Sequence, residues 1–438
     1  MQDGFVWQSR VFMARVGVFA MLAVIWGPTL ALAQSSEDRF VQREQRRIQR
    51  EPGNVGAYVR LADGFIRKAR ETADAGYLAR AEQALRRAVE IAPDHAGAAR
   101  HLAYALSARH DFPAAVVQAE KAIALDPADA DAHGVLGDAS LELGRYDRAA
   151  AAYEAMMRLK GDLASYSRRS GLKNLMGDPR GAIADLERAV LLGMANGQPR
   201  ESIAWAEWQL GAEHFAIGEI ERAEAKFRAA LETYPGYYRA LGGLGQVRAA
   251  QGRDDEAVRL YREALAVAPV PEYAVALGDI HAKQGRAADA RKQYDLVEHI
   301  GRLNALGAAI YDRELAYFYA DHDLKVDVAL ELAQREIAVR QDVYGYDLLA
   351  WALHKTGRSR EALAPMAEAL RLGTRDAKLF FHAGMIHRAA GDPERAREYL
   401  ARALATNPHF HVLHAAVAAR ALEELATGPT SDAVRAAR

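Results

Sequence analysis

The chain has 438 residues, with 57 basic and 58 acidic side chains and a formal net charge of −1. Because nucleic-acid binding relies on a concentrated basic field, this balance predicts no nucleic-acid partner. The absence of cysteine excludes disulfides, thiol catalysis, zinc–thiolate sites and a lipid-modified N-terminal cysteine.

The first 33 residues have the features of a signal peptide. Arg10 and Arg15 precede an apolar stretch that ends in the small-x-small pattern Ala31-Leu32-Ala33. Cleavage there predicts an exported protein, periplasmic or extracellular, without a transmembrane segment. Two alternatives stay open. Translation could start at Met13, and an uncleaved segment would be a membrane anchor, against which the break at Gly27-Pro28 argues.

A small residue that follows an apolar one recurs about every 34 positions along the rest of the chain. It occupies, in order, Ala103, Gly137, Gly171, Gly211, Gly245, Gly278, Ala316, Ala350 and Gly384. The successive differences are 34, 34, 40, 34, 33, 38, 34 and 34. The composition is rich in residues that favour helix. This period therefore predicts an all-α solenoid of helix–turn–helix units.

The residues around the recurring position follow one pattern. One unit has Leu244-Gly245, Gly252, Ala257, Tyr261, Ala264 and Pro269, and the last has Ala383-Gly384, Gly391, Ala396, Leu400, Ala403 and Pro408. This pattern resembles the tetratricopeptide repeat, in its bacterial exported type. The resemblance implies a right-handed α-solenoid, or superhelix, of about ten units. They start near Asn54, Ala96, Ala130, Ala164, Ala204, Tyr238, Pro271, Ala309, Val343 and Ala377.

Each element of the pattern has a packing role. The small residue of the first helix lets the second helix approach closely. The glycine about seven residues later ends the first helix in a left-handed cap. The aromatic residue or leucine of the second helix fills the space beside the close contact, and proline ends that helix.

The chain therefore divides into five segments. They are a signal peptide (1–33), an N-terminal polar helix or linker (34–53), one solenoid (54–408), a C-terminal capping helix (409–427) and a disordered tail (428–438). Insertions in repeat proteins map to loops or longer helices, and often to one functional face. Three segments break the period here: Arg67–Gly76, Gly193–Pro199 and Glu298–Ala309.

Two local motifs look like ligand loops but fit the repeat better. The run Gly242-Gly243-Leu244-Gly245-Gln246 has no preceding strand and contains a repeat position, so a phosphate loop is not expected. Asp321, Asp323 and Asp327 alternate as calcium ligands do. Lys325, however, stands where the next ligand should be, and no terminal glutamate follows. We expect a solvated turn with N-capping aspartates instead.

The densest histidine cluster is His409, His411 and His414, with His382 and His387 in the preceding unit. It could bind a divalent metal weakly. Because no carboxylate or fourth ligand follows at a defined spacing, we expect no native metal site and no cofactor. Hydrolase and metalloprotease motifs are absent from the sequence, and repeats account for nearly every residue, so we expect no enzyme.

The candidate partner-binding residues follow from the resemblance, because in the tetratricopeptide class the first helix of each unit lines a concave groove. One face of these helices carries Arg100, Tyr104, Asp138, Arg168, Trp205, Trp208, Phe215, Arg313, Tyr317, Tyr344, Asp347, Trp351, His354 and Phe381. Aromatic and arginine side chains are the usual anchors for protein partners. Trp205 and Trp208 have an alternative role, packing beneath the insertion that precedes them.

Family members that grip a peptide C-terminus place lysine and asparagine at fixed positions of successive units. The pairs at those positions here are Arg100/Tyr104, Gly134/Asp138 and Arg168/Leu172, so this clamp is absent. The sequence thus predicts an exported protein–protein interaction scaffold that binds a peptide or protein partner in its groove. Two alternatives remain. One is a structural subunit of an envelope secretion or polysaccharide-export assembly, and the other is a carbohydrate-binding solenoid.

Overall fold

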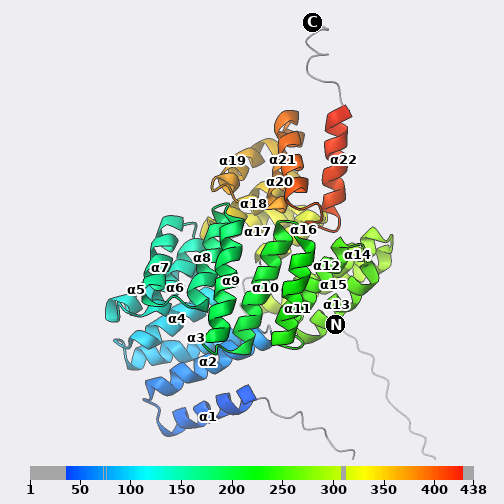
Figure 1. Ribbon diagram of the computed structural model, residues 1–438. Coiled ribbons are helices and arrows are strands. Elements are labelled where there is room, and N and C mark those ends of the chain that lie inside the picture. The colour runs from blue at the N-terminus through cyan, green and yellow to red at the C-terminus, as the bar shows by residue number, and fades with distance from the viewer. Residues whose placement is uncertain (1–35, 73, 75, 307–311, 428–438) are drawn as a thin grey trace, which may run out of the picture.

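The computed structural model describes residues 36–427 except 73, 75 and 307–311, and these residues form helices, turns and loops without a β-strand. Ten helix pairs follow one another between α1 (Ser36–Arg50) and α22 (His414–Thr427) (Figure 1). The first helices are α2 (Val55–Thr72), α4 (Ala96–Ala108), α6 (Ala130–Glu142), α8 (Leu163–Leu175), α10 (Arg200–Ala216), α12 (Tyr238–Ala250), α14 (Pro271–Lys283), α16 (Asp312–Asp321), α18 (Val343–Lys355) and α20 (Ala377–Ala390). The second helices are α3 (Gly76–Ile91), α5 (Phe112–Leu125), α7 (Tyr146–Leu159), α9 (Pro179–Ala195), α11 (Ile220–Thr233), α13 (Asp254–Val267), α15 (Ala287–Leu306), α17 (Val326–Val339), α19 (Ser359–Leu370) and α21 (Pro393–Thr406).

The predicted fold class, an all-α right-handed solenoid, is confirmed. Each helix packs on its partner and on the next pair, as expected for a repeat array. Across the described part of the chain, no helix combines the length and apolar character needed to cross a membrane. The expected signal peptide (1–33) and tail (428–438) lie outside the described residues.

The recurring glycine is a contact point between the two helices of a unit. A Cβ added at Gly137 or Gly278 would overlap the ring of Tyr153 or Tyr294, the residue sixteen positions later. At Gly211 the added atom would lie 2.6 Å from the ring of Phe227. The aromatic ring of the second helix therefore occupies the volume that the missing side chain leaves, as the sequence pattern predicted.

The turn that ends each first helix uses a left-handed residue. Glycine supplies it in most units, for example Gly252 at φ 73° and Gly391 at φ 88°. Two units lack glycine at this position and place His110 at φ 65° and Asp323 at φ 54° there. The turn thus keeps its left-handed conformation even in units where the sequence has no glycine, the residue that adopts this conformation most easily.

The three breaks in the period coincide with long helices. The segment Arg67–Gly76 spans the end of α2, which has 18 residues, and the start of α3. Gly193–Pro199 covers the end of α9 and the loop that leads to α10, and these two helices have 17 residues each. Glu298–Ala309 begins inside α15, which has 20 residues and ends at Leu306. Residues 307–311 are outside the described part of the chain.

The superhelix is wound tightly enough for distant units to touch. The Thr374 hydroxyl donates a hydrogen bond to the Leu175 carbonyl at 2.5 Å, and the Asn407 amide donates to the Phe215 carbonyl at 2.7 Å. Gly177 lies so close to Gly373 that an added Cβ would be 2.5 Å from its carbonyl oxygen. As a result α19 and α20 lie next to the turn between α8 and α9 (Figure 1).

Candidate functional site

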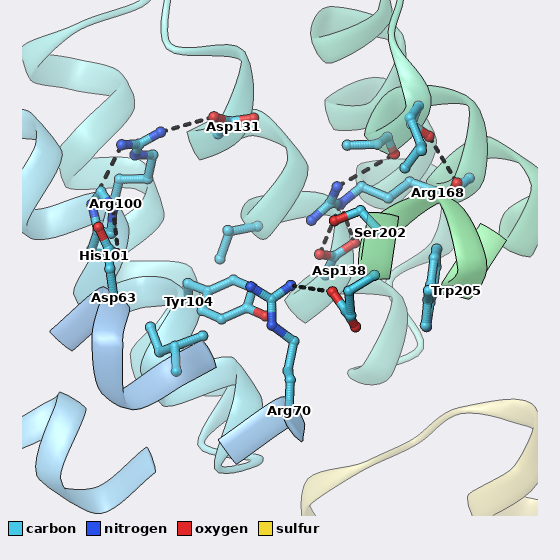
Figure 2. Close-up of a pocket in the computed structure, with 16 residues that line it drawn as sticks. Asp63, Arg70, Arg100, His101, Tyr104, Asp131, Asp138, Arg168, Ser202 and Trp205 are labelled. Atoms are coloured by element: carbon cyan, nitrogen blue, oxygen red, sulfur yellow. Dashed lines mark hydrogen bonds and ion pairs between the residues drawn. The ribbon is translucent and has the colours of Figure 1, made fainter. Parts of the chain in front are cut away.

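A cavity of about 610 Å³ opens on the concave face of the first five helix pairs. It is lined by the first helices α2, α4, α6, α8 and α10, as the resemblance implied for the groove (Figure 2). The lining residues are Asp63, Ile66, Arg70, Arg100, His101, Tyr104, Asp131, Val135, Asp138, Leu163, Ala164, Ser167, Arg168, Glu201, Ser202 and Trp205. Five of them, Arg100, Tyr104, Asp138, Arg168 and Trp205, are residues predicted for the groove.

One end of the cavity holds two linked polar contacts between neighbouring units (Figure 2). Arg100 Nη1 donates to Asp131 Oδ2 at 2.9 Å, and Arg100 Nε lies 3.4 Å from Asp129 Oδ2. His101 Nε2 lies 3.2 Å from Asp63 Oδ1. These side chains are half-buried, so they present fixed donors and acceptors at the wall of the cavity.

The middle of the cavity is organised by Asp138. Arg168 Nε donates to both Asp138 oxygens at 2.9 Å, and the Tyr153 hydroxyl donates to Oδ1 at 2.9 Å. Burial, followed by the neighbouring carboxylate, holds the pKa of Tyr153 well above its usual range, so the phenol remains a donor. Burial alone would lower the pKa of Arg168, but Asp138 outweighs it and raises the pKa. Gly134 admits the guanidinium, because a Cβ there would lie 3.2 Å from Arg168 Nε.

Two aromatic side chains complete the cavity wall. Tyr104 and Trp205 are both half-buried and come from α4 and α10, on either side of the polar centre (Figure 2). Arg70, at the end of α2, reaches across to Glu201 of α10, with 3.9 Å between Nη1 and Oε2. The Arg70 side chain remains 48% exposed, so this weak pair is open to an exchange with a ligand.

Several lining residues were not predicted from the sequence. Asp131 occupies the second position of its unit, so the helical-face rule could have found it. Asp63 and Arg70 belong to the stretched first unit, where the phase of the repeat cannot be read from its spacing. Glu201 lies at the beginning of the lengthened α10, and His101 lies one position beyond the predicted face.

The predicted groove residues of the C-terminal half are placed differently. Trp351 is 2% exposed and Phe381 is 1% exposed. The Trp351 indole stacks on His382 with ring centroids 4.1 Å apart, and its Nε1 donates to Asp321 Oδ1 at 2.9 Å. Both side chains therefore pack inside the protein and present no open surface. His354, which is half-buried, also stacks on Trp351, with ring centroids 5.0 Å apart.

The remaining C-terminal candidates form internal polar contacts. Arg313 is bound between Glu336, at 2.9 Å from Nε, and Asp342, at 2.7 Å from Nη2. The Tyr317 hydroxyl lies 2.7 Å from Asp347 Oδ2 and 3.0 Å from the carbonyl oxygen of Tyr344. Asp347 is 2% exposed. These polar groups are therefore satisfied by hydrogen bonds inside the fold, and they do not line the cavity.

Trp208 and Phe215 also lie outside the cavity. Trp208 is half-buried beneath Arg239, whose guanidinium carbon is 5.0 Å from the ring centroid. Phe215 is 5% exposed and packs in a core cluster with Phe227. Trp208 therefore packs beside Arg239 and the Phe227 cluster, whereas Trp205 lines the cavity.

The two sequence motifs that look like ligand loops have different outcomes in the structure. Gly242 and Gly243 lie within α12 against the rings of Tyr273 and Phe227, which supports the packing interpretation. The expectation of a solvated turn with N-capping aspartates was wrong in part. Asp321 has a buried carboxylate, with only 7% of its side chain exposed. The N-cap of α17 is Lys325, which makes no side-chain capping bond.

Comparison with known proteins supports the repeat assignment. The sequence profile of the tetratricopeptide repeat matches residues 102–163, 209–269, 255–305 and 348–409. No curated protein matches the chain. Among solved structures, YrrB, a tetratricopeptide repeat protein with an unusual peptide-binding site, is 22% identical, with 46% of this chain and 99% of YrrB covered and a TM-score of 0.31. TTC0263, a thermophilic repeat protein of Thermus thermophilus, is 18% identical, with 47% and 99% covered and a TM-score of 0.38. The human IFIT1 dimer with m7Gppp-AAAA is 13% identical, with 77% of each chain covered and a TM-score of 0.47.

Proposed function

Because the chain belongs to the tetratricopeptide repeat family, whose members are protein–protein interaction scaffolds, we propose that it binds an extended peptide segment of a partner protein. The binding site is the cavity formed by α2, α4, α6, α8 and α10. The family fold is typically a non-catalytic scaffold, and the proposal assigns this chain no reaction.

The observation that carries the proposal is the alignment of inward-facing side chains from successive units. Tyr104, Asp138, Arg168 and Trp205 come from four consecutive first helices and converge on one cavity. An extended peptide needs repeated donors and acceptors for its backbone, which the ion pairs supply. It also needs apolar pockets for its side chains, which Tyr104 and Trp205 border.

The C-terminal half of the concave face supports this location indirectly. Its aromatic side chains, above all Trp351 and Phe381, are packed within the fold. A partner segment would have to displace them before it could bind there, and this would open a core. The N-terminal cavity needs no such rearrangement.

The test uses a peptide selected from a random display library on the intact chain, with binding measured by fluorescence anisotropy. Tyr104→Ala should weaken binding at least tenfold. Tyr166→Ala is the matched control, because this half-buried tyrosine of α8 does not line the cavity. If the two variants bind the peptide with equal affinity and keep their helical content, the cavity is not the binding site. Selection of glycans but no peptides on the same cavity would favour the carbohydrate alternative.

We further propose that the protein is exported and cleaved after Ala33. The support is the sequence of the first 33 residues alone. Cell fractionation and mass spectrometry of the N-terminus test it, with Ala31→Gln and Ala33→Gln together as the variant that blocks cleavage. A cytoplasmic protein with residues 1–33 intact would reject the proposal.

A further inference from the structure

The histidine-rich segment that follows α21 folds back against the end of α16. Asp321, His411 and His414 each offer one ligand atom, and these three atoms all lie within 4.8 Å of one another. The imidazole rings of His411 and His414 stack with centroids 4.2 Å apart. The carboxylate that the histidine motif lacks in sequence is thus supplied by a residue about 90 positions earlier.

Two buried nitrogen atoms in this cluster have no hydrogen-bond partner. His414 turns Nε2 toward the carbonyl oxygen of Asp321 at 3.4 Å, and its Nδ1 is buried and unpaired. His382 is fully buried, and its unpaired Nε2 lies 3.8 Å from Asp321 Oδ1. A buried polar nitrogen without a hydrogen-bond partner is unfavourable, so each of these nitrogens is suited to bind an additional ligand.

His382 is oriented by a second carboxylate. Its Nδ1 lies 2.9 and 3.0 Å from the two carboxylate oxygens of Asp347, and its Nε2 faces Asp321 Oδ1 at 3.8 Å. A histidine held by a carboxylate in this way is the usual supporting arrangement of a metal ligand. His411 Nδ1 accepts only two long bonds, from the backbone N–H groups of Leu413 and His414 at 3.2 and 3.3 Å.

We propose that Asp321, His411 and His414 bind a divalent first-row transition metal ion, and that His382, which lies 3.8 Å from Asp321 Oδ1 but outside the 4.8 Å group, moves in as the fourth ligand when the ion binds. Three imidazoles and one carboxylate match the ligand preference of Zn²⁺ and its neighbours, whereas Ca²⁺ and Mg²⁺ prefer oxygen ligands. The proposal is independent of the peptide-binding cavity, which lies in the other half of the chain.

The ion would join three helices. Asp321 ends α16, His382 lies in α20 and His414 begins α22. One cation opposes the site: the Lys378 ammonium donates to Asp321 Oδ2 at 2.9 Å. Its charge reduces the affinity for a metal ion, so removing this charge should strengthen binding.

The experiment is titration of the intact, tag-free chain with ZnCl₂ by calorimetry, with MgCl₂ as the comparison ion. We expect one Zn²⁺ per chain, a higher thermal midpoint in its presence and no response to Mg²⁺. The double variant His411→Ala/His414→Ala should lose the binding and the thermal shift. His409→Ala should keep both, because His409 belongs to the same motif but is exposed.

Two single variants keep the test valid if the double variant is misfolded. His382→Gln should bind Zn²⁺ at least tenfold more weakly, and Lys378→Met should bind it more tightly. The absence of saturable Zn²⁺ binding to the unmodified chain would overturn the proposal and leave a buried polar cluster only. Binding that is lost equally in His409→Ala, or unchanged in His382→Gln, would overturn the assigned ligands.

Discussion

The Tyr146 hydroxyl accepts a hydrogen bond from the backbone N–H of Val343 at 2.9 Å, although the two residues are 197 positions apart. Arg340 forms an ion pair with Glu142 beside it. The contacts of Thr374 with Leu175 and of Asn407 with Phe215 repeat this relationship one and two units further along. The solenoid therefore closes on itself. We call the line of these contacts the seam: each repeat unit from α6 to α10 contributes one contact with a unit 192 to 199 residues later.

Alanine substitutions at two glycines test whether the contact at the seam forms. Gly144 and Gly252 have nearly the same backbone, at φ 70° and 73°, so alanine costs about 1–2 kcal/mol at either position through the left-handed conformation. An added Cβ at Gly144 would also overlap the carbonyl of Gln341, whereas at Gly252 nothing lies within 4 Å. We expect Gly144→Ala to lower the free energy of unfolding by clearly more than Gly252→Ala. Equal effects in urea denaturation would mean that the seam does not form.

Removing the Tyr146 hydroxyl tests the seam through its hydrogen bond with Val343. Tyr146→Phe leaves the buried N–H of Val343 without its acceptor, which should cost about 1–3 kcal/mol. The ring itself stays in place against Arg371, whose guanidinium carbon is 5.2 Å from its centroid. Thermal unfolding of the intact chain measures the loss, and an unchanged midpoint would argue against the bond.

Stability should depend on pH through Glu213. Burial, and to a lesser extent Asp376, raises the pKa of this carboxyl from 4.5 to about 7. The folded state thus binds the proton more tightly than the unfolded state. The stability that the neutral carboxyl provides is complete below pH 4.5 and is lost as the pH rises through 7.

Glu213→Gln keeps a neutral group of the same shape at every pH. We expect the variant to match the parent near pH 4.5 and to be more stable at pH 8, by at most about 3 kcal/mol. Glu263→Gln, an exposed change on α13, serves as the control. A difference that does not grow between pH 5 and 8 would contradict the assignment to Glu213.

The close contact between the two helices of a unit can be tested at the recurring glycine, which has a crowded environment in one unit and an open one in another. Gly278→Ala would overlap the ring of Tyr294, which is fixed by its bond to Asp279 at 2.9 Å, and should cost about 1–3 kcal/mol. Gly171 occupies the same position with nothing within 4 Å, so alanine there should stabilise by about 0.5–1 kcal/mol. Calorimetric midpoints that move in the same direction would reject this explanation of the repeat.

The sequence predicts the local parts of this fold well, because their causes are local. The contact of Gly137 with Tyr153 spans sixteen residues, and the caps at Gly252 and Gly391 follow directly from the spacing. The position of the cavity follows in part, through Arg100 and Arg168, because one helical face must look toward the superhelix axis.

The seam could not be predicted from the same pattern. The bond between Tyr146 and Val343 depends on small rotations summed over several units, and no spacing in the sequence reports them. The burial of Trp351 and Phe381 has the same origin, since curvature decides whether a concave residue meets solvent or its neighbours. Asp321 joined His411 and His414 only through this three-dimensional arrangement.

Closure of the superhelix brings distant units together and leaves the N-terminal cavity as the site for a partner. Since the chain has no cysteine, spin labels can be placed at Arg145→Cys and Gln341→Cys alone, two exposed positions beside the seam. Double electron–electron resonance measures the distance between them in solution. A closed superhelix predicts one short and narrow distance distribution, and a long, broad distribution would contradict closure.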